Sequence, residues 1–567
     1  MRRITIAVAT ALSLGGAAQA AQPPVRGYNG MVATSERRAS EVGVDILKHG
    51  GNAIDAAVAV GYALAVVHPC CGNLGGGGFA LIHLANGKTT VISFRERAPQ
   101  AATANLFLDA RGDPVPRSSQ VGYKAVAVPG SVLGLETMRQ RYGRLSRARV
   151  MAPAIRLAEH GYKLSADNVG LLSQKTSDFA RQPNVAAIFL HNGEPWREGE
   201  VFVQADLART LKLIARDGPD AFYNGPIADE IVAASQANGG ILSKRDFEAY
   251  TVVENLPVRC RYRRYEIVTA APPSAGGVAL CEILMVLQGY DLNAAGFNSA
   301  VSVHLLAEAM RHAFVDRNFR LGDPAFVHNP VDELVSSQHA AAVRTQIKPD
   351  KATSSVEITA GKLLPEGAQT THVSIIDRRG NAVALTVTLN YNYGAKVIAG
   401  HTGFFLNDTM DDFTARPGGA TFSGLVEGRN NAIGPGKRPL AAMTPTMLLR
   451  SGRVAMVIGS PGGFRIITTV AQVISNTLDH GMDIQSAIDA PRVHLQWLPD
   501  TLYLEPNAIS PATRQDLTDM GYALEDDTPW SEADAEGIVV KPGRRPDQTL
   551  FLGGHDSRRP GSAAIGY

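Results

Sequence analysis

The sequence predicts a large α/β protein, because three of its features agree. With 45% hydrophobic and 19% charged residues, the 567-residue chain has the composition of a globular enzyme or binding protein, not of a disordered or fibrous one. Between residues 35 and 350 the apolar spacing is mainly helical, whereas from residue 370 it alternates as in β-strands. The length allows roughly three or four average domains or one large two-layered domain.

Charge and cysteine content narrow the functional classes. The chain carries 55 Lys and Arg against 53 Asp and Glu, a net charge of +2, which gives no electrostatic reason to expect nucleic-acid binding. Adjacent Cys70 and Cys71 cannot easily bridge each other without strain. Cys260 and Cys281 flank a Pro-rich turn and could pair, although small packing residues are the favoured interpretation. No zinc-type Cys/His spacing occurs, so we expect neither a metal nor another cofactor.

Residues 1–20 have the pattern of a cleavable export signal. A basic start at Arg2 and Arg3 precedes an apolar run over 4–16 and a small-x-small site at Ala18-Gln19-Ala20. The run is too short to anchor the chain in a bilayer, and the alternative is a buried N-terminal helix. We therefore expect a periplasmic or secreted protein without a membrane anchor.

The first half of the chain predicts helices separated by Gly and Pro. Asn52 is placed to cap a buried helix over 53–67, with Asp55 suiting its positive N-terminal end and Pro69 following its end. The glycines at 75–78 precede a strand and lack the Lys-Ser/Thr of a phosphate loop, so they predict close backbone packing instead. Further helices are expected over 149–160, 203–216, 228–237 and 300–314, followed by an exposed linker over 348–369.

A β-hairpin begins at the end of this linker. Residues 371–376 and 382–389 alternate around a turn at 377–381. Apolar runs at 445–449 and 454–458 predict two more strands, and a helix is expected over 466–478. The pattern alone does not distinguish Thr370, at the head of the hairpin, from any other residue at the start of a strand.

An ordered set of motifs carries a more specific indication. In the second half these are Gln369-Thr370-Thr371-His372, Gly380-Asn381-Ala382, Thr388-Leu389-Asn390, Asp411-Asp412-Phe413, Gly434-Pro435-Gly436-Lys437-Arg438-Pro439 and Gly459-Ser460-Pro461-Gly462-Gly463. In the first half they are Gly50-Gly51-Asn52-Ala53, Gly72 to Phe79, Phe94-Arg95-Glu96, Val128-Pro129-Gly130, Pro272-Pro273-Ser274 and Leu321-Gly322-Asp323-Pro324. Together they resemble the γ-glutamyltranspeptidase family of N-terminal-nucleophile hydrolases over nearly the whole chain.

The resemblance implies a proenzyme that cuts itself between Gln369 and Thr370. A large subunit over 21–369 and a small subunit over 370–567 would pair with each other. The implied fold is a four-layer αββα sandwich, in which two stacked sheets receive strands from both subunits.

The resemblance also assigns the catalytic groups. A threonine hydroxyl needs a neighbouring base, and the α-amino group that the cut would free on Thr370 titrates near ~8 and can serve as that base. Thr370 then attacks the γ-amide carbonyl, and Thr388 matches a hydroxyl that hydrogen-bonds the nucleophile. The backbone N–H groups of Gly462 and Gly463 match the oxyanion hole.

The substrate pocket both follows and departs from the family pattern. Arg95 matches a clamp for the glutamyl α-carboxylate, and Asn390 and Asp412 match groups that hold the α-ammonium. Ala441 and Ala442 stand where typical members have two serines that bind the α-carboxylate. The other departures are Thr409 in place of an amide side chain, Phe464 in place of a small polar residue, and Phe422-Ser423 within the lid segment 417–424.

Three functions remain open from the sequence. The favoured one is a γ-glutamyltransferase or glutathione hydrolase, with water, an amino acid or a dipeptide as acceptor. The second is a cephalosporin acylase of the same family that removes glutaryl-type groups, which lack an α-ammonium for Asp412 and Asn390 to hold. The third is an exported binding protein without catalytic activity, against which Thr370, Thr388, Gly462 and Gly463 argue. His68 and His372 are weaker candidates for bases and are interpreted as structural.

Overall fold

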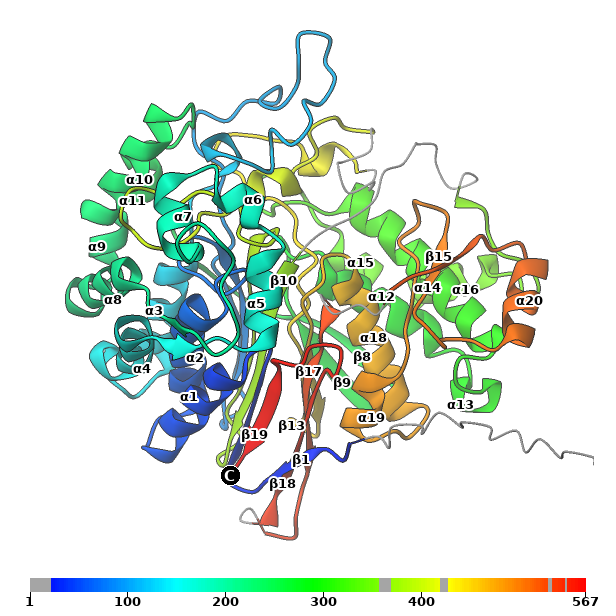
Figure 1. The fold of residues 1–567 in the computed structure, drawn as a ribbon. Helices are drawn as coiled ribbons and strands as arrows, with labels where there is room; N and C mark the ends of the chain where they lie inside the picture. The colour runs from blue at the N-terminus through cyan, green and yellow to red at the C-terminus, as the bar shows by residue number, and fades with distance from the viewer. Residues whose placement is uncertain (1–21, 356–368, 419–426, 529–532, 546–547) are drawn as a thin grey trace, which may run out of the picture.

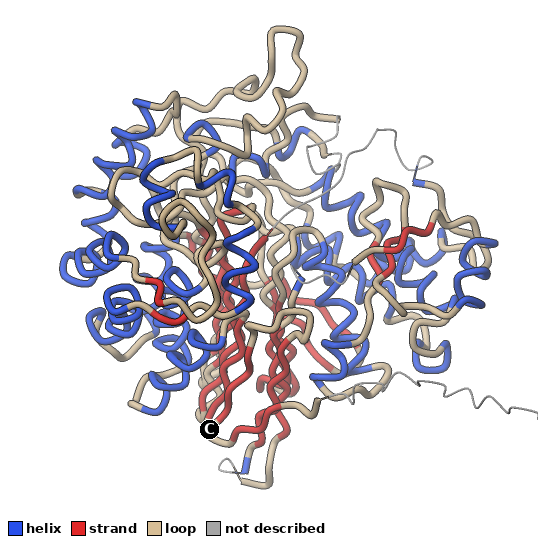
Figure 2. The backbone as a smooth tube through the Cα atoms, viewed as in Figure 1, coloured by secondary structure: helices blue, strands red, loops and turns tan. Residues whose placement is uncertain are grey.

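Two seven-stranded sheets stack face to face between two layers of helices, the αββα sandwich that the resemblance implies (Figures 1 and 2). The computed structural model describes residues 22–355, 369–418, 427–528, 533–545 and 548–567. The predicted export signal, most of the predicted linker and most of the lid segment lie outside these residues.

Both sheets are antiparallel and draw strands from both halves of the chain. The first sheet has the order β19 (Ala563–Gly566), β2 (Gly30–Thr34), β10 (Gln369–Asp377), β11 (Ala382–Asn390), β3 (Gly77–His83), β4 (Thr89–Ser93), β7 (Val253–Asn255). The second sheet has the order β1 (Val25–Gly27), β18 (Leu550–His555), β17 (Glu536–Lys541), β13 (Arg453–Gly459), β12 (Thr446–Arg450), β9 (Tyr265–Thr269), β8 (Val258–Tyr262). The two halves therefore form one interleaved fold.

The predicted hairpin forms β10 and β11 at the centre of the first sheet. Because side chains alternate along a strand, Val373 and Ile375 face the helices while His372 and Ser374 face the second sheet. The His372 ring packs on β13, where a Cβ on Gly459 would lie 2.2 Å from its Cε1. Both ring nitrogens bond hydroxyls, of Thr386 at 2.8 Å and Ser374 at 3.2 Å, and burial lowers the pKa of His372 to about 3. This histidine is therefore a neutral side chain packed between the sheets.

Helices from the first half of the chain cover the first sheet (left in Figure 1). They are α1 (Arg37–Lys48), α2 (Ala53–Val67), α3 (Ser131–Tyr142), α4 (Arg147–His160), α5 (Ala166–Ser173), α6 (Thr176–Phe179), α7 (Pro183–Phe189), α8 (Ala205–Asp217), α9 (Pro219–Tyr223), α10 (Pro226–Ala237) and α11 (Lys244–Glu248). As predicted, Asn52 caps α2: its Oδ1 accepts from the backbone N–H of Ile54 and Asp55, and Asp55 accepts from that of Asn52.

A second helical layer covers the other sheet (right in Figure 1). Its helices are α12 (Gly276–Leu287), α13 (Leu292–Ala295), α14 (Ala300–Arg320), α15 (Val331–Leu334), α16 (Ser337–Gln346), α18 (Arg465–Leu478), α19 (Ile484–Asp489) and α20 (Pro511–Asp519). Two small sheets complete the fold: β14 (Val493–His494), β15 (Leu502–Leu504), β16 (Leu524–Asp526), and β5 (Tyr162–Lys163), β6 (Val201–Phe202). Across the described residues, none of these helices combines the length and apolarity needed to cross a bilayer.

The predicted linker is exposed over 348–351, as expected, but is anchored at Ser355, which corrects the prediction in part. Ser355 is fully buried, and its hydroxyl donates to the carbonyl of Trp497 at 2.6 Å. Its backbone N–H donates to Asp500, and Arg311 of α14 donates to its Oγ. The polar sequence suggested exposure, but Ser355 finds partners 44 positions before it, at Arg311, and more than 140 positions after it, at Trp497 and Asp500.

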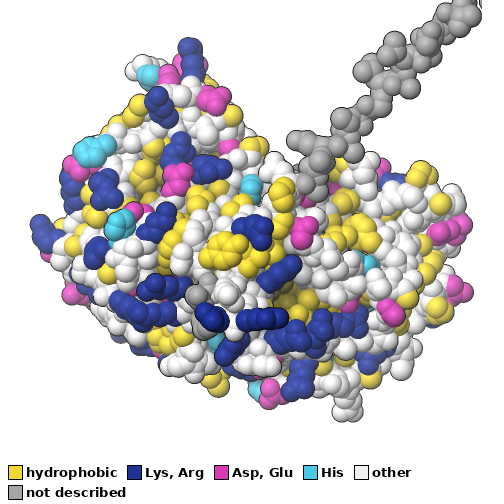
Figure 3. Space-filling model, turned by 90° about the horizontal axis from the view of Figure 1, so that it is seen from below, with side chains coloured by type: hydrophobic (Ala, Val, Ile, Leu, Met, Phe, Trp, Pro, Cys, Tyr) yellow, Lys and Arg dark blue, Asp and Glu magenta, His cyan; other side chains and the backbone are white. Residues whose placement is uncertain are grey.

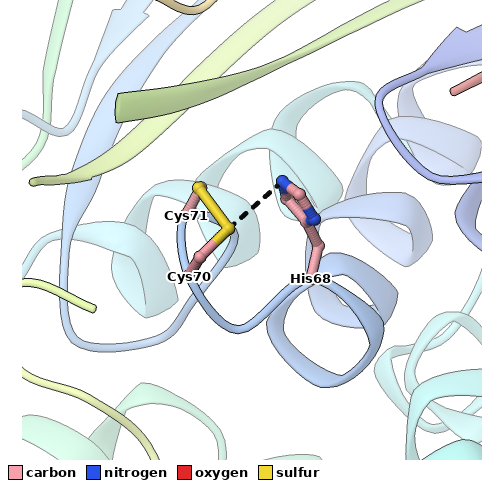
Figure 4. Close-up of side chains that lie close together, drawn as sticks. All are labelled: His68, Cys70 and Cys71. Carbon is pink, nitrogen blue, oxygen red and sulfur yellow. Dashed lines mark hydrogen bonds between the residues drawn. A yellow bond between two sulfur atoms is a disulfide. The ribbon is translucent and has the colours of Figure 1, made fainter. Parts of the chain in front are cut away.

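Both cysteine pairs are joined, contrary to the favoured sequence interpretation. Cys260 of β8 and Cys281 of α12 form a disulfide with a Cα–Cα distance of 5.9 Å, because α12 packs across β8. Adjacent Cys70 and Cys71 also form a disulfide, in the turn that follows α2 (Figure 4). His68 lies beside this pair, with its Nε2 3.4 Å from Cys70 Sγ, and burial lowers its pKa well below the ordinary value.

The small net charge conceals an uneven surface. On the face seen from below, lysine and arginine side chains gather in a band across the molecule (Figure 3). The balance of +2 therefore describes the whole chain and not each of its faces.

Candidate active site

A pocket opens at the end of the first sheet where β10 begins. Residues from both halves of the chain line it: Arg95, Arg317, Thr370, Thr388, Asn390, Tyr391, Asp411, Asp412, Glu427, Leu440, Ala441, Ala442, Met443, Gly463, Phe464 and Ile466. Eight of the ten residues assigned to catalysis or substrate binding from the resemblance are among them; Gly462 and Thr409 are not.

Thr370 lies at the start of β10, directly after an irregularity in the pairing of β10 with β11. It pairs with Thr388 of β11, and the register of the two strands shifts between Gln369 and Thr370, at the predicted scissile bond. The Thr370 hydroxyl lies 3.4 Å from Thr388 Oγ1, which also accepts from the backbone N–H of Asn390 at 2.9 Å. Both threonines are at least 95% buried, so the sheet fixes the direction of the Thr370 hydroxyl.

The glycine run at 75–78 allows β3 and its preceding turn to lie close to this site. A Cβ on Gly76 would lie 2.0 Å from the carbonyl oxygen of Thr388, and one on Gly78 2.2 Å from that of Thr386. The predicted close backbone packing is therefore confirmed. It lets the turn lie directly against the strand that carries Thr388.

Gly462 and Gly463 form the turn between β13 and α18. Their φ angles are 114° and 57°, a region that glycine adopts without strain. Their carbonyls accept from the N–H groups of Arg465 and Ile466 in the first turn of α18. The positive end of the α18 dipole therefore lies beside Gly463 in the pocket wall, where it favours a developing negative charge.

Arg95 is the charged centre of the pocket and is fully buried. It pairs with Asp412 and Glu96, and also donates to the carbonyls of Pro439 at 3.2 Å and Leu440 at 3.1 Å. Burial alone would lower the pKa of Arg95, but the two carboxylates raise it, so the guanidinium stays charged. The paired Arg95 and Asp412 thus present one positive and one negative group to the pocket.

Thr409 and Asn390 lie at different distances from the pocket. Thr409, in the 3-10 helix η2 (Thr409–Asp412), is completely buried and donates to Glu96 Oε1 at 2.9 Å. It therefore acts on Arg95 through Glu96 and not on the pocket directly. Asn390 lines the pocket at the end of β11, where its φ is 81° and its amide donates to the carbonyl of Asp408 at 3.3 Å.

Ala441 and Ala442 line the pocket on a segment held by its neighbours. The N–H of Ala441 donates to Pro273, and its carbonyl accepts from Ala275, both at 2.9 Å. The Thr444 hydroxyl bonds the Ala442 carbonyl at 2.8 Å. The two methyl groups are therefore fixed in the pocket wall.

Sequence reasoning did not identify two charged pocket residues, Arg317 and Glu427. Arg317 Nη1 lies 2.6 Å from Glu427 Oε1, and its guanidinium lies 4.6 Å from the Phe464 ring centroid. Glu427 Oε2 also accepts from Thr414 and Asn431, both at 2.7 Å. No local motif marks either residue. Glu96 and Asp411 are different, because they are the sequence neighbours of the assigned residues Arg95 and Asp412 and could have been identified from that position.

Comparisons with known proteins agree with this geometry. A family model described as gamma-glutamyltranspeptidase matches residues 39–566. The glutathione hydrolase proenzyme of Pseudomonas sp. (strain A14) is 48% identical over 565 residues, covering 99% of this chain and 98% of that protein. The corresponding proenzyme of Escherichia coli (strain K12) is 44% identical over 550 residues, covering 96% and 93%. A solved cephalosporin acylase from Bacillus halodurans aligns with a TM-score of 0.84 and 28% identity, covering 98% of this chain and 99% of that one. The chain belongs to the gamma-glutamyltranspeptidase family.

Proposed function

We propose that this protein is an autoprocessing glutathione hydrolase and γ-glutamyltransferase whose nucleophile is Thr370. The observation that carries the proposal is a single pocket in which the Thr370 hydroxyl, oriented by Thr388, shares the wall with the Arg95–Asp412 pair. Cleavage after Gln369 gives subunits 21–369 and 370–567, and the pattern of residues 1–20 supports export of the protein.

The cut supplies the base that the nucleophile lacks. Hydrolysis of the Gln369–Thr370 peptide bond leaves a carboxylate on Gln369 and an α-amino group on Thr370. A neutral amine accepts the hydroxyl proton as Thr370 Oγ1 bonds the γ-carbonyl carbon of the substrate. The carbonyl oxygen becomes an oxyanion, which the N–H groups of Gly462 and Gly463 stabilise beside the N-terminus of α18.

Collapse of this intermediate releases the amine half of the substrate. The C–N bond breaks, the leaving nitrogen takes the proton from the α-ammonium, and the γ-glutamyl group remains on Thr370 as an ester. Water or an acceptor amine then attacks the ester carbonyl by the same route, giving glutamate or a new γ-glutamyl amide. Thr388 keeps the Thr370 hydroxyl directed at the pocket through both steps.

Recognition of the glutamyl group uses the charged pair. A γ-glutamyl amide carries an α-carboxylate and an α-ammonium, which complement Arg95 and Asp412 respectively. The substrate can replace the contact between these two side chains with two of its own, while Glu96 continues to balance Arg95. Arg317 adds a second buried guanidinium to the pocket wall and supports binding of the carboxylate in the absence of the usual serines.

Restoring hydroxyl groups at positions 441 and 442 tests this account of the carboxylate. The double substitution Ala441→Ser and Ala442→Ser adds two donors to the wall, each worth about 1.5–3 kcal/mol when bonded to a charged group. We expect the KM for γ-glutamyl-p-nitroanilide to fall at least about tenfold with kcat little changed. An unchanged KM would mean that the carboxylate does not approach these residues.

The buried carboxyl group of Asp411 in the pocket predicts that ligand binding depends on pH. Burial raises the pKa of Asp411 to about 6, with the Asp412 charge adding to the effect and the Ser119 hydroxyl opposing it. As the pH falls through 6, Asp411 gains a proton and its attraction for a substrate ammonium is lost. We expect the inhibition constant of L-glutamate to rise by about an order of magnitude from pH 7 to pH 5. Asp411→Asn should remove most of this rise, and an equal rise in both proteins would contradict the assignment.

A cephalosporin acylase is the second candidate, since a solved acylase shares the fold over 98% of this chain. A glutaryl group has no α-ammonium, so it would leave Asp411 and Asp412 facing the pocket without a cationic ligand. These two carboxylates favour the γ-glutamyl substrate.

Kinetics with glutathione test the proposed function. Purified protein should release glutamate from glutathione, and a dipeptide acceptor such as glycylglycine should divert part of the γ-glutamyl group into a new amide. Absence of both products from a correctly cut protein would overturn the proposal.

A further inference from the structure

Three ionisable side chains meet in the second helical layer, outside the residues that line the active-site pocket. They are Glu282 of α12, Asp316 of α14 and His339 of α16, and one ligand atom from each lies within 4.8 Å of the others. His339 Nε2 lies 3.1 Å from Asp316 Oδ2 and 3.5 Å from Glu282 Oε2.

Glu282 is the unusual member of this cluster. It is only 3% exposed, yet neither of its carboxylate oxygens accepts a hydrogen bond from the described residues. By contrast, the buried carboxylate of Glu427 accepts from Arg317, Thr414 and Asn431. Burial of a carboxylate costs several kcal/mol unless it is compensated, and burial raises the pKa of Glu282 to about 8.

A protonated His339 does not by itself compensate both acids. Its Nε2 faces both carboxylates, but this nitrogen carries a single N–H that can point along one direction. Asp316 is the nearer acceptor, so the N–H of His339 points to Asp316. Asp316 also contacts Arg320 at 3.4 Å. Glu282 is then left with its 3.5 Å contact to His339 and with the like charge of Asp316 beside it, which raises the pKa of Glu282 further. A cation placed between the three groups would balance the charge of both carboxylates and bind the imidazole nitrogen.

We propose that Glu282, Asp316 and His339 bind a divalent transition-metal ion of the Zn²⁺ type. One imidazole and two carboxylates are a ligand set that zinc accepts, and three protein ligands leave a fourth position for water. Asp316 and His339 have partly exposed side chains, at 16% and 18%, which gives the ion a path of entry. On binding, His339 releases its Nε2 proton and Glu282 releases the proton that it holds below its raised pKa, both to solvent, so the ion meets a neutral imidazole and two carboxylates.

The site has a structural role, because its ligands come from three different helices. An ion held by α12, α14 and α16 links them and stabilises only the folded state, so the unfolding temperature should rise with the zinc concentration. This role is independent of the reaction in the pocket, and its failure would leave the proposed glutathione hydrolase activity untouched.

Zinc titration of the processed protein, freed of metal with a chelator, tests the proposal. We expect calorimetry to show one Zn²⁺ per chain at this site and thermal unfolding to shift upward with zinc. His339→Ala and the isosteric Glu282→Gln should each weaken zinc binding at least 100-fold and abolish the shift. His49→Ala is the matched control, because His49 forms an exposed pair with Asp45 at 3.1 Å and should bind zinc as the wild type does.

Two results would overturn the proposal. In the first, wild-type protein neither binds zinc nor changes its unfolding temperature, while His339→Ala unfolds at a lower temperature without metal, as expected for an ion pair alone. In the second, His339→Ala and Glu282→Gln are both folded and bind zinc as tightly as the wild type, which would place the ion elsewhere.

Discussion

Replacing Thr370 with alanine leaves the protein as one uncut chain without γ-glutamyl transfer activity. The substitution removes the hydroxyl that lies 3.4 Å from Thr388 Oγ1 at the start of β10. Thr388, the residue opposite, lies on the neighbouring strand and gains no free α-amino group from the cut. On a denaturing gel we expect a single band slightly below the 60.2 kDa of the full chain, because the predicted export signal is removed, in place of two fragments. Activity with γ-glutamyl-p-nitroanilide should fall to background.

Thr371→Ala is the matched control for this experiment. Thr371 is equally buried, but alternation along β10 turns its side chain to the opposite face, where its hydroxyl donates to Ser35 at 3.2 Å. We expect the Thr371→Ala protein to be cut normally and to retain activity. Thr370→Ser should also be cut and active, because serine supplies a hydroxyl at the same position. Two fragments from Thr370→Ala would contradict the nucleophile assignment.

The second large effect is expected on substrate preference. The wild-type protein should turn over a γ-glutamyl anilide with a kcat/KM at least 100-fold above that of the glutaryl anilide, because only the former carries the ammonium that Asp412 attracts. Asp412→Asn removes this charge while Glu96 still balances Arg95. Loss of a charged hydrogen bond of about 3 kcal/mol should lower kcat/KM for the γ-glutamyl substrate about 100-fold.

The glutaryl anilide is the internal control for Asp412→Asn. Its turnover should change far less, since it makes no contact that requires the carboxylate. A wild-type preference for the glutaryl compound would instead favour the acylase alternative, in which the buried acids at 411 and 412 do not hold a substrate cation.

Local patterns predicted the regular elements and failed where polar residues find distant partners. The hairpin and α18 differ from their predicted bounds by at most two residues. In contrast, a helix was expected over 300–314, and α14 continues through several polar residues to Arg320. Those polar residues include Arg317, which is buried against Glu427, 110 positions further along the chain. A single sequence contains no signal for such a pair.

In the candidate site, too, local motifs predicted some features, and contacts between distant residues set the others. Its assigned residues came from ordered motifs, and the structure brings Arg95 and Asp412 together although 317 positions separate them. Glu96, which balances Arg95, is bonded by Thr409. This contact depends on how η2 lies beside the segment that follows β4, and spacing along the sequence could not predict it. The Cys260–Cys281 disulfide likewise depends on α12 crossing β8.

N-terminal sequencing of the smaller fragment tests the central claim most directly. The account requires that the catalytic amine and hydroxyl belong to one residue, so the fragment should begin Thr-Thr-His-Val, with Thr370 first. A fragment that begins at any other residue, or an active protein that remains a single chain, would contradict the account.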